Sequence, residues 1–349
     1  MPLSIVIPTH NQAPELRKHL PAILEQDYED YEVIVVDIAS TDETREVLEE
    51  LGLRFPALRH SGTPATARDI SLERLALTLG IRAAKHEWVV ITHANCQPAS
   101  PLWLKTLSQH MTEDKGIVLG VAKYDEERHT WFDYKVSFFR LWNTLANLRH
   151  IRSGHAAVRA DGCNLALRRS LFLSEDGFGD HLNLLTGTEE LLINRLSTAK
   201  NTTVCDSPDA IVIEDRMTAS RLWKKHRIFY METRRHQRHT FIYRTRQNLR
   251  LLTPWLLLCA LCALWPSLHH FFPEEDLAVG IITGLVFILF FIAVGVWINR
   301  WNCAAHVIGY KRNYFITLPL FTFSLPFWNL SACLSHRFAP ESEFRKKFV

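Results

Sequence analysis

The chain has 349 residues and a formal net charge of +3, and its length predicts a sizeable core and more than one region. Its seven cysteines are odd in number and scattered, which argues against a disulfide framework and fits a reducing compartment. Charge is unevenly distributed: residues 1–215 carry 22 Lys and Arg against 31 Asp and Glu, residues 216–250 carry 11 against one, and residues 251–349 carry 7 against 5. We therefore expect three regions with these boundaries.

The N-terminal region begins with two short apolar strands, each followed by a helix. The first strand covers residues 3–8 and leads through a polar turn into a helix over about residues 13–25. The second covers residues 32–37, and its run of β-branched residues without polar alternation indicates a strand covered on both faces, as in a parallel sheet. The next helix, over residues 43–51, is expected to be capped by Asp42.

A third strand, over residues 88–92, ends at His93-Ala94-Asn95-Cys96. Strands and helices that alternate in this order predict right-handed crossovers and one parallel sheet. Because ligands bind beyond the carboxyl ends of such strands, the three polar strand ends are expected to converge on one site. Asp37 is therefore expected to be a site residue rather than only the end of its strand.

The last hundred residues contain three apolar segments, over residues 251–272, 277–298 and 314–334. Each approaches the roughly 20 residues needed to cross a hydrocarbon core. The first two are predicted to span the membrane. Two prolines and an asparagine interrupt the third, and a third crossing would place the basic C-terminus outside, against the positive-inside rule. We therefore favour a re-entrant or interfacial third segment, with a third span as the alternative.

Charge also predicts the orientation of the chain. The basic residues 216–250 precede the first predicted span, so by the positive-inside rule the N-terminal region lies in the cytoplasm. No signal peptide precedes the first strand. We expect a multi-pass protein of the inner (cytoplasmic) membrane with a cytoplasmic N-terminal domain, whose basic amphipathic juxtamembrane segment lies on anionic membrane lipid. Nucleic acid is not an expected partner because the positive charge abuts a span. Cys259 and Cys262, a CxxC pair inside that span, are expected to be packing residues.

The strand ends IVIPTHNQ, EVIVVDIASTDET and WVVITHANCQP resemble, in sequence and order, those of glycosyltransferase family 2, an inverting family of GT-A fold. The resemblance covers roughly residues 1–215 and continues more weakly through 216–250. It implies an α/β domain with a Rossmann-like, mostly parallel sheet that binds a nucleotide-sugar donor, here followed by C-terminal transmembrane helices.

In that family the first two strand ends hold the nucleoside of the donor. By position, the nucleotide would be bordered by Pro8, Thr9 and Asn11. The Asp37 carboxylate would accept hydrogen bonds from the base or ribose. Ile38 stands where the family often has a second Asp. Arg68 would reach the diphosphate or, with equal weight, be an ordinary surface ion-pair partner.

The third strand end departs from the family, which has an Asp-x-Asp motif there to hold a divalent cation against the donor's pyrophosphate. This chain has His93-Ala94-Asn95, whose polar side chains can coordinate a metal but bring no negative charge. A cation held by His93 and Asn95 is then expected to be Mn²⁺ rather than Mg²⁺. The alternatives are direct hydrogen bonds from both residues to the diphosphate, or a site that has decayed.

An inverting transfer needs a carboxylate that takes the proton from the acceptor hydroxyl. The family uses the Asp of an acidic pair that is followed by an Arg, and the segment from Gly187 to Arg195 occupies that position. The match places Glu189 at the base with Glu190 behind it, although Glu is one methylene longer than Asp. Both residues also suit the first turn of a helix, and the two roles are compatible.

The segment that begins Asp161-Gly162-Cys163-Asn164 resembles the one that precedes the base in related membrane-anchored members. Gly162 and Asn164 are therefore expected on the acceptor side, the alternative being a turn that leads into a strand. Trp223 is expected to touch the acceptor or diphosphate, or to lie on the lipid surface. The Gln-x-x-Arg-Trp motif of processive synthases is absent, which favours transfer of a single sugar.

These features predict an inverting glycosyltransferase that moves a sugar from a nucleotide-sugar donor to a lipid-linked or other membrane-proximal glycan acceptor, in cell-surface polysaccharide or glycoconjugate synthesis. The alternative is a catalytically degenerate relative that binds nucleotide, lipid or a partner protein.

Overall fold

The computed structural model describes residues 1–63, 70–217, 219–271 and 276–345. Arg68, predicted to lie near the diphosphate, falls outside the described residues. The chain divides into two compact units, which we call unit 1 (Met1–His239 with Ala332–Val349) and unit 2 (Thr240–Ser331). The boundary at residue 215 expected from charge therefore falls inside unit 1, and the structure places the division at His239.

Unit 1 is built on a seven-stranded sheet of order β3-β2-β1-β4-β8-β6-β9. These strands are β1 Leu3–Thr9, β2 Tyr31–Asp37, β3 Leu58–Gly62, β4 Trp88–Ile91, β6 Ile117–Gly120, β8 Leu165–Arg168 and β9 Thr202–Cys205. Strands β1, β2 and β4 are mutually parallel, as predicted, and β3, which was not predicted, is parallel to β2, whereas β8 runs antiparallel to β4 and β6. A small second sheet has the order β5-β10-β7, with β5 Cys96–Pro98, β7 Ala122–Tyr124 and β10 Val212–Glu214.

Helices cover both faces of the large sheet, which explains the uninterrupted apolar run of β2. They are α1 Ala13–Leu24, α2 Thr44–Arg54, α3 Leu72–Ala83, α4 Trp103–Ser108, α5 Trp131–Arg152, α6 Arg169–Ser174, α7 Thr188–Leu196 and α8 Ser220–His236. Successive side chains of a strand point to opposite faces, so Val33 and Val35 enter one apolar cluster, with residues of α1 and α2. Ile34 and Val36 enter the other, with residues of α3 and α7.

Asp42 lies between the starts of two helices. Its carboxylate accepts a hydrogen bond from the backbone N–H of Thr44 at the start of α2, at 3.1 Å, and another from the backbone N–H of Ala13 at the start of α1, also at 3.1 Å. A carboxylate at a helix N-terminus satisfies backbone donors that have no partner inside the helix. The structure begins α2 at Thr44 with Glu43 at its N-cap, so Asp42 stands one residue before the cap position; its carboxylate still binds the first N–H of the helix and joins α1 to α2.

The basic segment of residues 216–250 is not one element. Helix α8 belongs to unit 1 because it buries one side, including Trp223, Arg227 and Met231. The C-terminal residues of unit 1 pack on the same helix, where Nε2 of His336 lies 2.8 Å from Oε2 of Glu232. A separate helix, α9 (Phe241–Phe271), begins in unit 2. The charge run therefore covers the end of one unit and the start of the next.

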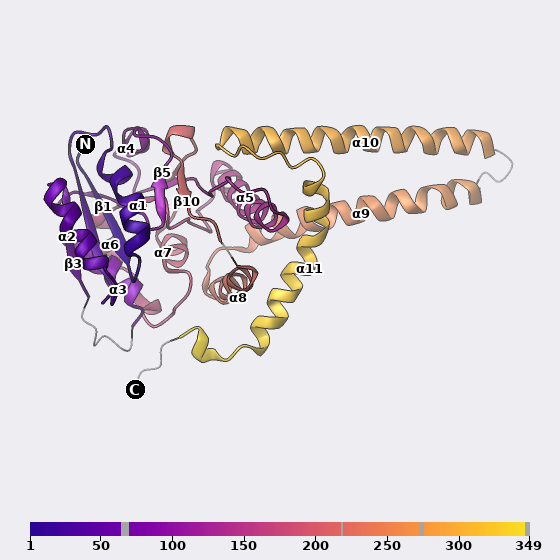
Figure 1. Cartoon of the computed structure of the whole chain (residues 1–349). Helices are drawn as coiled ribbons and strands as arrows, with labels where there is room; N and C mark the ends of the chain where they lie inside the picture. The colour runs from indigo at the N-terminus through magenta and orange to yellow at the C-terminus, as the bar shows by residue number, and fades with distance from the viewer. Residues whose placement is uncertain (64–69, 218, 272–275, 346–349) are drawn as a thin grey trace. The chain divides into compact units, whose positions relative to one another are not determined.

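Unit 2 contains α9, α10 (Asp276–Val307) and most of α11 (Thr317–Phe338). Figure 1 shows α9 and α10 side by side, and they pack on each other. Within the described residues, the stretches Phe241–His270 and Leu277–Val307 are the two helices long and apolar enough to cross a membrane, by length and composition only. The third apolar segment forms α11, which is not among them.

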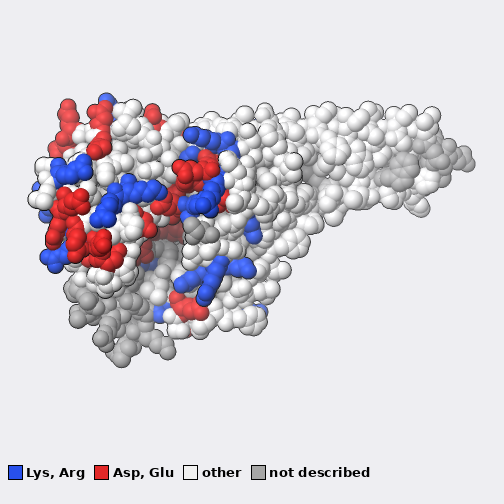
Figure 2. Space-filling model, in the orientation of Figure 1, with Lys and Arg blue, Asp and Glu red and all other residues white. Residues whose placement is uncertain are grey.

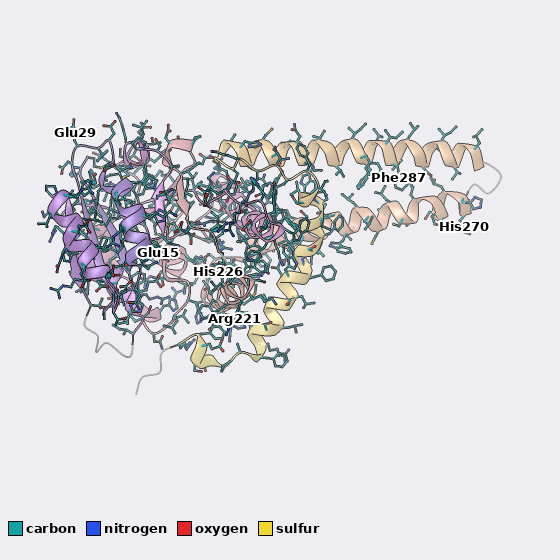
Figure 3. All side chains as sticks on the ribbon, in the orientation of Figure 1. Glu15, Glu29, Arg221, His226, His270 and Phe287 are labelled. Atoms are coloured by element: carbon teal, nitrogen blue, oxygen red, sulfur yellow. The ribbon has the colours of Figure 1, made fainter. Side chains whose placement is uncertain are left out.

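Charged and apolar side chains are distributed differently in the two units. On the visible face, Lys, Arg, Asp and Glu gather over unit 1, whereas α9 and α10 are almost free of them (Figure 2). Large apolar side chains such as Phe287, labelled on α10 in Figure 3, are exposed along this helix. Exposed apolar surface on this scale marks a region that contacts lipid or another apolar surface.

Candidate active site

The ends of β1 and β2 bring together the residues predicted to hold the nucleoside. Thr9 and Asp37 are register partners at the ends of the two strands. The Asp37 carboxylate accepts the backbone N–H of Ser40 at 3.2 Å. The amide oxygen of Asn11 accepts the backbone N–H of Thr41 at 2.7 Å. Asp37 and Asn11 thus fix the loop that follows β2 from two sides.

The residues at this edge differ in how far they are exposed. Pro8 and Thr9 are buried within β1, whereas Asp37 is half-buried and Asn11 is exposed at the rim. Asn11 has a φ of 52°, in the left-handed region that Asn tolerates better than most residues. Its backbone N–H donates to the hydroxyl of Ser40 at 2.8 Å, which requires this turn. The donor-side residues therefore form one connected edge.

The end of β4 brings His93 to the predicted base. Nε2 of His93 lies 3.0 Å from Oε1 of Glu189, which occupies the first turn of α7, as expected for this acidic pair. Glu189 is 8% exposed. Gly162 lies directly against its carboxylate, since a Cβ on this glycine would come within 2.5 Å of Glu189 Cδ. Gly162 thus leaves the space in which the carboxylate sits.

The two groups shift one another's pKa. Burial alone would raise the pKa of Glu189, but the hydrogen bond and charge of His93 outweigh it and hold the pKa of Glu189 below its usual value. Burial alone would lower the pKa of His93, but its interactions with Cys163 and Glu189 raise it well above the usual value. An imidazolium–carboxylate pair is the state that both shifts favour at neutral pH.

The structure adds a second carboxyl group that the sequence did not mark. Glu73, in the first turn of α3, offers an oxygen within 4.8 Å of the ligand atoms of His93 and Glu189. Its carboxyl accepts the hydroxyl of Thr188 at 3.0 Å. Burial and the charge of Glu189 raise the pKa of Glu73. Two carboxyl groups thus lie near the imidazole of His93. Glu73, whose pKa is raised, holds its proton more tightly than Glu189, whose pKa is lowered.

Glu190 faces a different partner. Its Oε1 lies 2.8 Å from Nη2 of Arg159, whose guanidinium also stacks over the ring of Tyr230 at 4.1 Å. Burial raises the pKa of Glu190, and Arg159 counteracts that rise. Glu190 is therefore an ion-paired neighbour of the predicted base, and the structure separates the roles of the two acidic residues.

A cavity of about 360 Å³ opens beside this pair. It is lined by the end of β4, by α5, α7 and α8, and by the turn before β8; its residues include Glu73, His93, Arg140, Gly162, Cys163, Glu189, Glu190, Trp223, His226 and Tyr230. His226, labelled in Figure 3, and Trp223 come from α8. Gly162 and Trp223, both predicted on the acceptor side, thus reach the cavity wall.

Asn164, the third residue predicted on the acceptor side, is fully buried behind that wall. Its amide donates to the backbone carbonyls of Val121 and Ala210, at 2.9 and 2.7 Å. Its carbonyl accepts the indole N–H of Trp103 at 3.1 Å. The side chain therefore joins β8 to its neighbours and does not line the cavity.

Asn95 is also engaged by protein partners. Its amide nitrogen donates to Oε1 of Glu214 at 3.3 Å, and its carbonyl accepts the thiol of Cys96 at 3.6 Å. With Nε2 of His93 bonded to Glu189, the two side chains do not form the oxygen-rich pair that Mg²⁺ or Mn²⁺ prefers. The residues at the position of the family's Asp-x-Asp motif therefore do not fit a hard cation as they are arranged here.

The sequence is similar to known glycosyltransferases over part of its length, and the family match includes His93 but ends before Glu189. Residues 4–172 match the model of Glycosyl transferase family 2. The chain is 35% identical to chondroitin synthase of Escherichia coli over 136 residues, which are 38% of this chain and 19% of that protein. It is 27% identical to glycosyltransferase GlyG of Streptococcus pneumoniae over 139 residues, 38% of this chain and 43% of that protein. These matches span less than half the length of either relative.

A solved structure is similar over most of the chain. It is the mannosyltransferase PcManGT from Pyrobaculum calidifontis, in complex with GDP-Man and Mn²⁺, with a TM-score of 0.60 and 18% identity over 96% of this chain and 87% of that chain. At this identity the likeness shows the fold. With the family match and the strand ends at Thr9, Asp37 and His93, it follows that the N-terminal part of this chain is a glycosyl transferase family 2 domain of GT-A fold.

Proposed function

We propose that this chain is an inverting glycosyltransferase that moves a sugar from a nucleotide-sugar donor to a lipid-linked or other membrane-proximal glycan acceptor. The observation that carries the proposal is the position of Glu189. It is a buried carboxylate on the wall of a cavity, bonded to His93 just beyond the end of β4, and β4 is the neighbour of β1 in the sheet. Family membership and this placement support the same reaction class.

The chemistry follows from the protein's own groups. Glu189 is ionised at neutral pH because His93 lowers its pKa, so it can accept a proton. In the transfer it takes the proton of an acceptor hydroxyl, while the oxygen attacks the anomeric carbon from the face opposite the leaving nucleoside diphosphate. His93 holds the orientation of the carboxylate, and Gly162 leaves the space that it occupies.

Unit 2 supports a location of the reaction at a membrane. Two helices long and apolar enough to span a membrane, α9 and α10, support anchoring in the inner membrane as a multi-pass protein. The basic residues at the end of unit 1 and the start of α9 support a cytoplasmic placement of unit 1. Anchoring would concentrate the domain where lipid-linked acceptors of cell-surface polysaccharide or glycoconjugate synthesis reside.

The test is the substitution Glu189→Gln, which keeps the size of the side chain and removes its basicity. We expect turnover to fall by about 10²- to 10⁴-fold while nucleotide affinity stays unchanged. Glu46→Gln, on the exposed side of α2, is the matched control and should leave both unchanged. Full turnover in Glu189→Gln would contradict the role of base. Tight nucleotide binding with no turnover for any donor would instead support the alternative of a degenerate binding protein.

A second test addresses the divalent cation. Replacing His93 and Asn95 together by Asp would place one new carboxylate beside Glu73 and Glu189 and another beside Glu214, and their mutual repulsion would favour a cation. We expect Mn²⁺ to raise the melting temperature of this double variant more than that of the native chain. An equal Mn²⁺ effect on both chains would show that the native residues already hold the ion.

A further inference from the structure

On the side of His93 that faces away from Glu189, two buried cysteines approach the same imidazole. Nδ1 of His93 lies 3.8 Å from Sγ of Cys163. A ring nitrogen of His93 and the sulfurs of Cys96 and Cys163 all lie within 4.8 Å of one another. The thiols of Cys96 and Cys163 also interact with each other. One nitrogen and two sulfurs therefore converge on a single point.

The fold places these three residues together through two adjacent turns. His93 lies in the turn after β4 and Cys96 is the first residue of β5; the backbone N–H of Cys96 closes that turn by donating to the carbonyl of His93 at 3.1 Å. Cys163 belongs to the turn before β8, and β8 pairs with β4, with Ile91 opposite Leu165. The juxtaposition thus rests on the central sheet and not on loops alone.

We propose that His93, Cys96 and Cys163 form a site for a borderline-soft divalent ion of the Zn²⁺ class. Thiolate and imidazole ligands select Zn²⁺ and similar ions over Mg²⁺ and Mn²⁺, which prefer oxygen. Three protein ligands leave a fourth position, and both His93 and Cys163 line the cavity from which a water molecule could occupy it. This site differs from the family's cation position in its ligands.

The second nitrogen of His93 supports this assignment. A metal-bound histidine usually donates its other ring N–H to a carboxylate, which fixes the tautomer and the ring orientation. In this structure Nε2 of His93 is bonded to Oε1 of Glu189, which leaves Nδ1 facing the sulfurs. The carboxylate–histidine part of such a centre is therefore already assembled.

Binding changes the charge of the site in a balanced way. The thiols of Cys96 and Cys163 and the Nδ1–H of the His93 imidazolium each release a proton to solvent, so that His93 binds as the neutral imidazole, and two sulfur–metal bonds and one nitrogen–metal bond form. The two thiolate charges then balance the charge of the ion. The guanidinium of Arg140, with Nη2 3.8 Å from Sγ of Cys163, already interacts with this sulfur.

The experiment uses Co²⁺ as a spectroscopic probe of the full-length chain. The four exposed cysteines are first replaced by Ser, so that the CxxC pair does not contribute; they are Cys259, Cys262, Cys303 and Cys333. We expect one equivalent of Co²⁺ to bind, with a thiolate-to-cobalt charge-transfer band, and Zn²⁺ to displace it. Cys96→Ser and Cys163→Ser should each weaken binding at least tenfold and reduce the band. Cys205→Ser, at a buried cysteine outside the cluster, should change neither.

A Co²⁺ measurement on the native chain alone can overturn the proposal, so the test does not depend on the folding of any variant. Co²⁺ bound without a charge-transfer band would exclude thiolate ligands and favour Glu73, His93 and Glu189 as the binding group. A band that survives in both Cys96→Ser and Cys163→Ser would place the metal elsewhere. Metal binding is measured directly, so its outcome is separate from that of the sugar-transfer assay on Glu189→Gln.

Discussion

Nε2 of His93 lies 3.0 Å from Oε1 of Glu189, so the residue at the family's metal-binding position is bonded to the residue matched to the catalytic base. Two residues that the sequence analysis singled out separately, at the end of β4 and at the start of α7, therefore meet in one contact. The longer Glu side chain reaches the imidazole, and the imidazole supplies the positive charge that keeps this buried carboxylate ionised.

This contact predicts the pH dependence of transfer. In His93→Gln the imidazolium that lowers the pKa of Glu189 is gone, whereas the burial that raises it remains. We expect the acid limb of the kcat/KM profile to move to higher pH than in the native chain. Measuring transfer across the pH range tests this expectation. An acid limb that stays in place would mean that His93 does not control the ionisation of the base.

The same pair predicts how stability depends on pH. The contribution of Glu189, whose folded pKa is lowered from 4.5, is fully present above 4.5 and is lost as pH falls through the folded value. The contribution of His93, whose folded pKa is raised above 6.5, is fully present below 6.5 and is lost as pH rises through the folded value. The free energy of unfolding measured by denaturant titration should therefore differ most between the native chain and His93→Gln between pH 4.5 and pH 6.5.

Gly162→Ala tests the position of Glu189 without changing a charge. The added Cβ would come within 2.5 Å of Glu189 Cδ, so the carboxylate must move. A displacement of about 1 Å at a reacting group can cost about a hundredfold in rate, and we expect a loss of that order in kcat. Gly52→Ala, on α2, is the control because a Cβ there meets nothing within 4 Å. Equal kcat for native and Gly162→Ala chains would show that the catalytic carboxylate lies elsewhere.

The first strand ends could be read from the sequence because their signal is local. The apolar run of β2 is interrupted at Asp37, and no distant residue is needed to recognise that edge. Strand β3 has no such signal, since only Leu58 of its five residues is buried. Glu73 had no signal either: it stands in an ordinary helix start and reaches Glu189 only because α3 and α7 pack on the same face of the sheet.

Asn164 shows a different limit of sequence reasoning. An Asn beside a predicted base has donors and acceptors that suit a sugar hydroxyl, and nothing in the sequence reveals that β6, β8 and α4 enclose it. The structure uses all three of its hydrogen-bonding functions within the domain. The residue type predicted a side chain that makes hydrogen bonds. The tertiary packing determines that its partners are groups of the protein itself.

Asn164→Ala is therefore expected to affect stability. It would leave the indole N–H of Trp103 and two carbonyls without their present partner, at about 1–3 kcal/mol for each group that stays buried and unsatisfied. We expect unfolding free energy to fall by about 3 kcal/mol or more in denaturant titrations. Asn143→Ala, at a cavity-lining position whose side chain donates to the backbone carbonyl of Phe139 at 2.7 Å, should cost much less. A stable Asn164→Ala chain with reduced acceptor binding would restore the acceptor role predicted from sequence.

Asp37→Asn tests the donor edge. The carboxylate at the end of β2 is expected to accept hydrogen bonds from the nucleoside, and hydrogen bonds to a charged group are worth about 1.5–3 kcal/mol. Losing that charge should weaken nucleotide binding by about 10- to 100-fold in calorimetric titration. Because this contact is far from the transferred sugar in the donor, KM for the donor should rise and kcat should change little. Asp27→Asn, at an exposed turn, is the matched control. Unchanged nucleotide affinity in Asp37→Asn would show that the nucleoside does not depend on the β1–β2 edge for its binding.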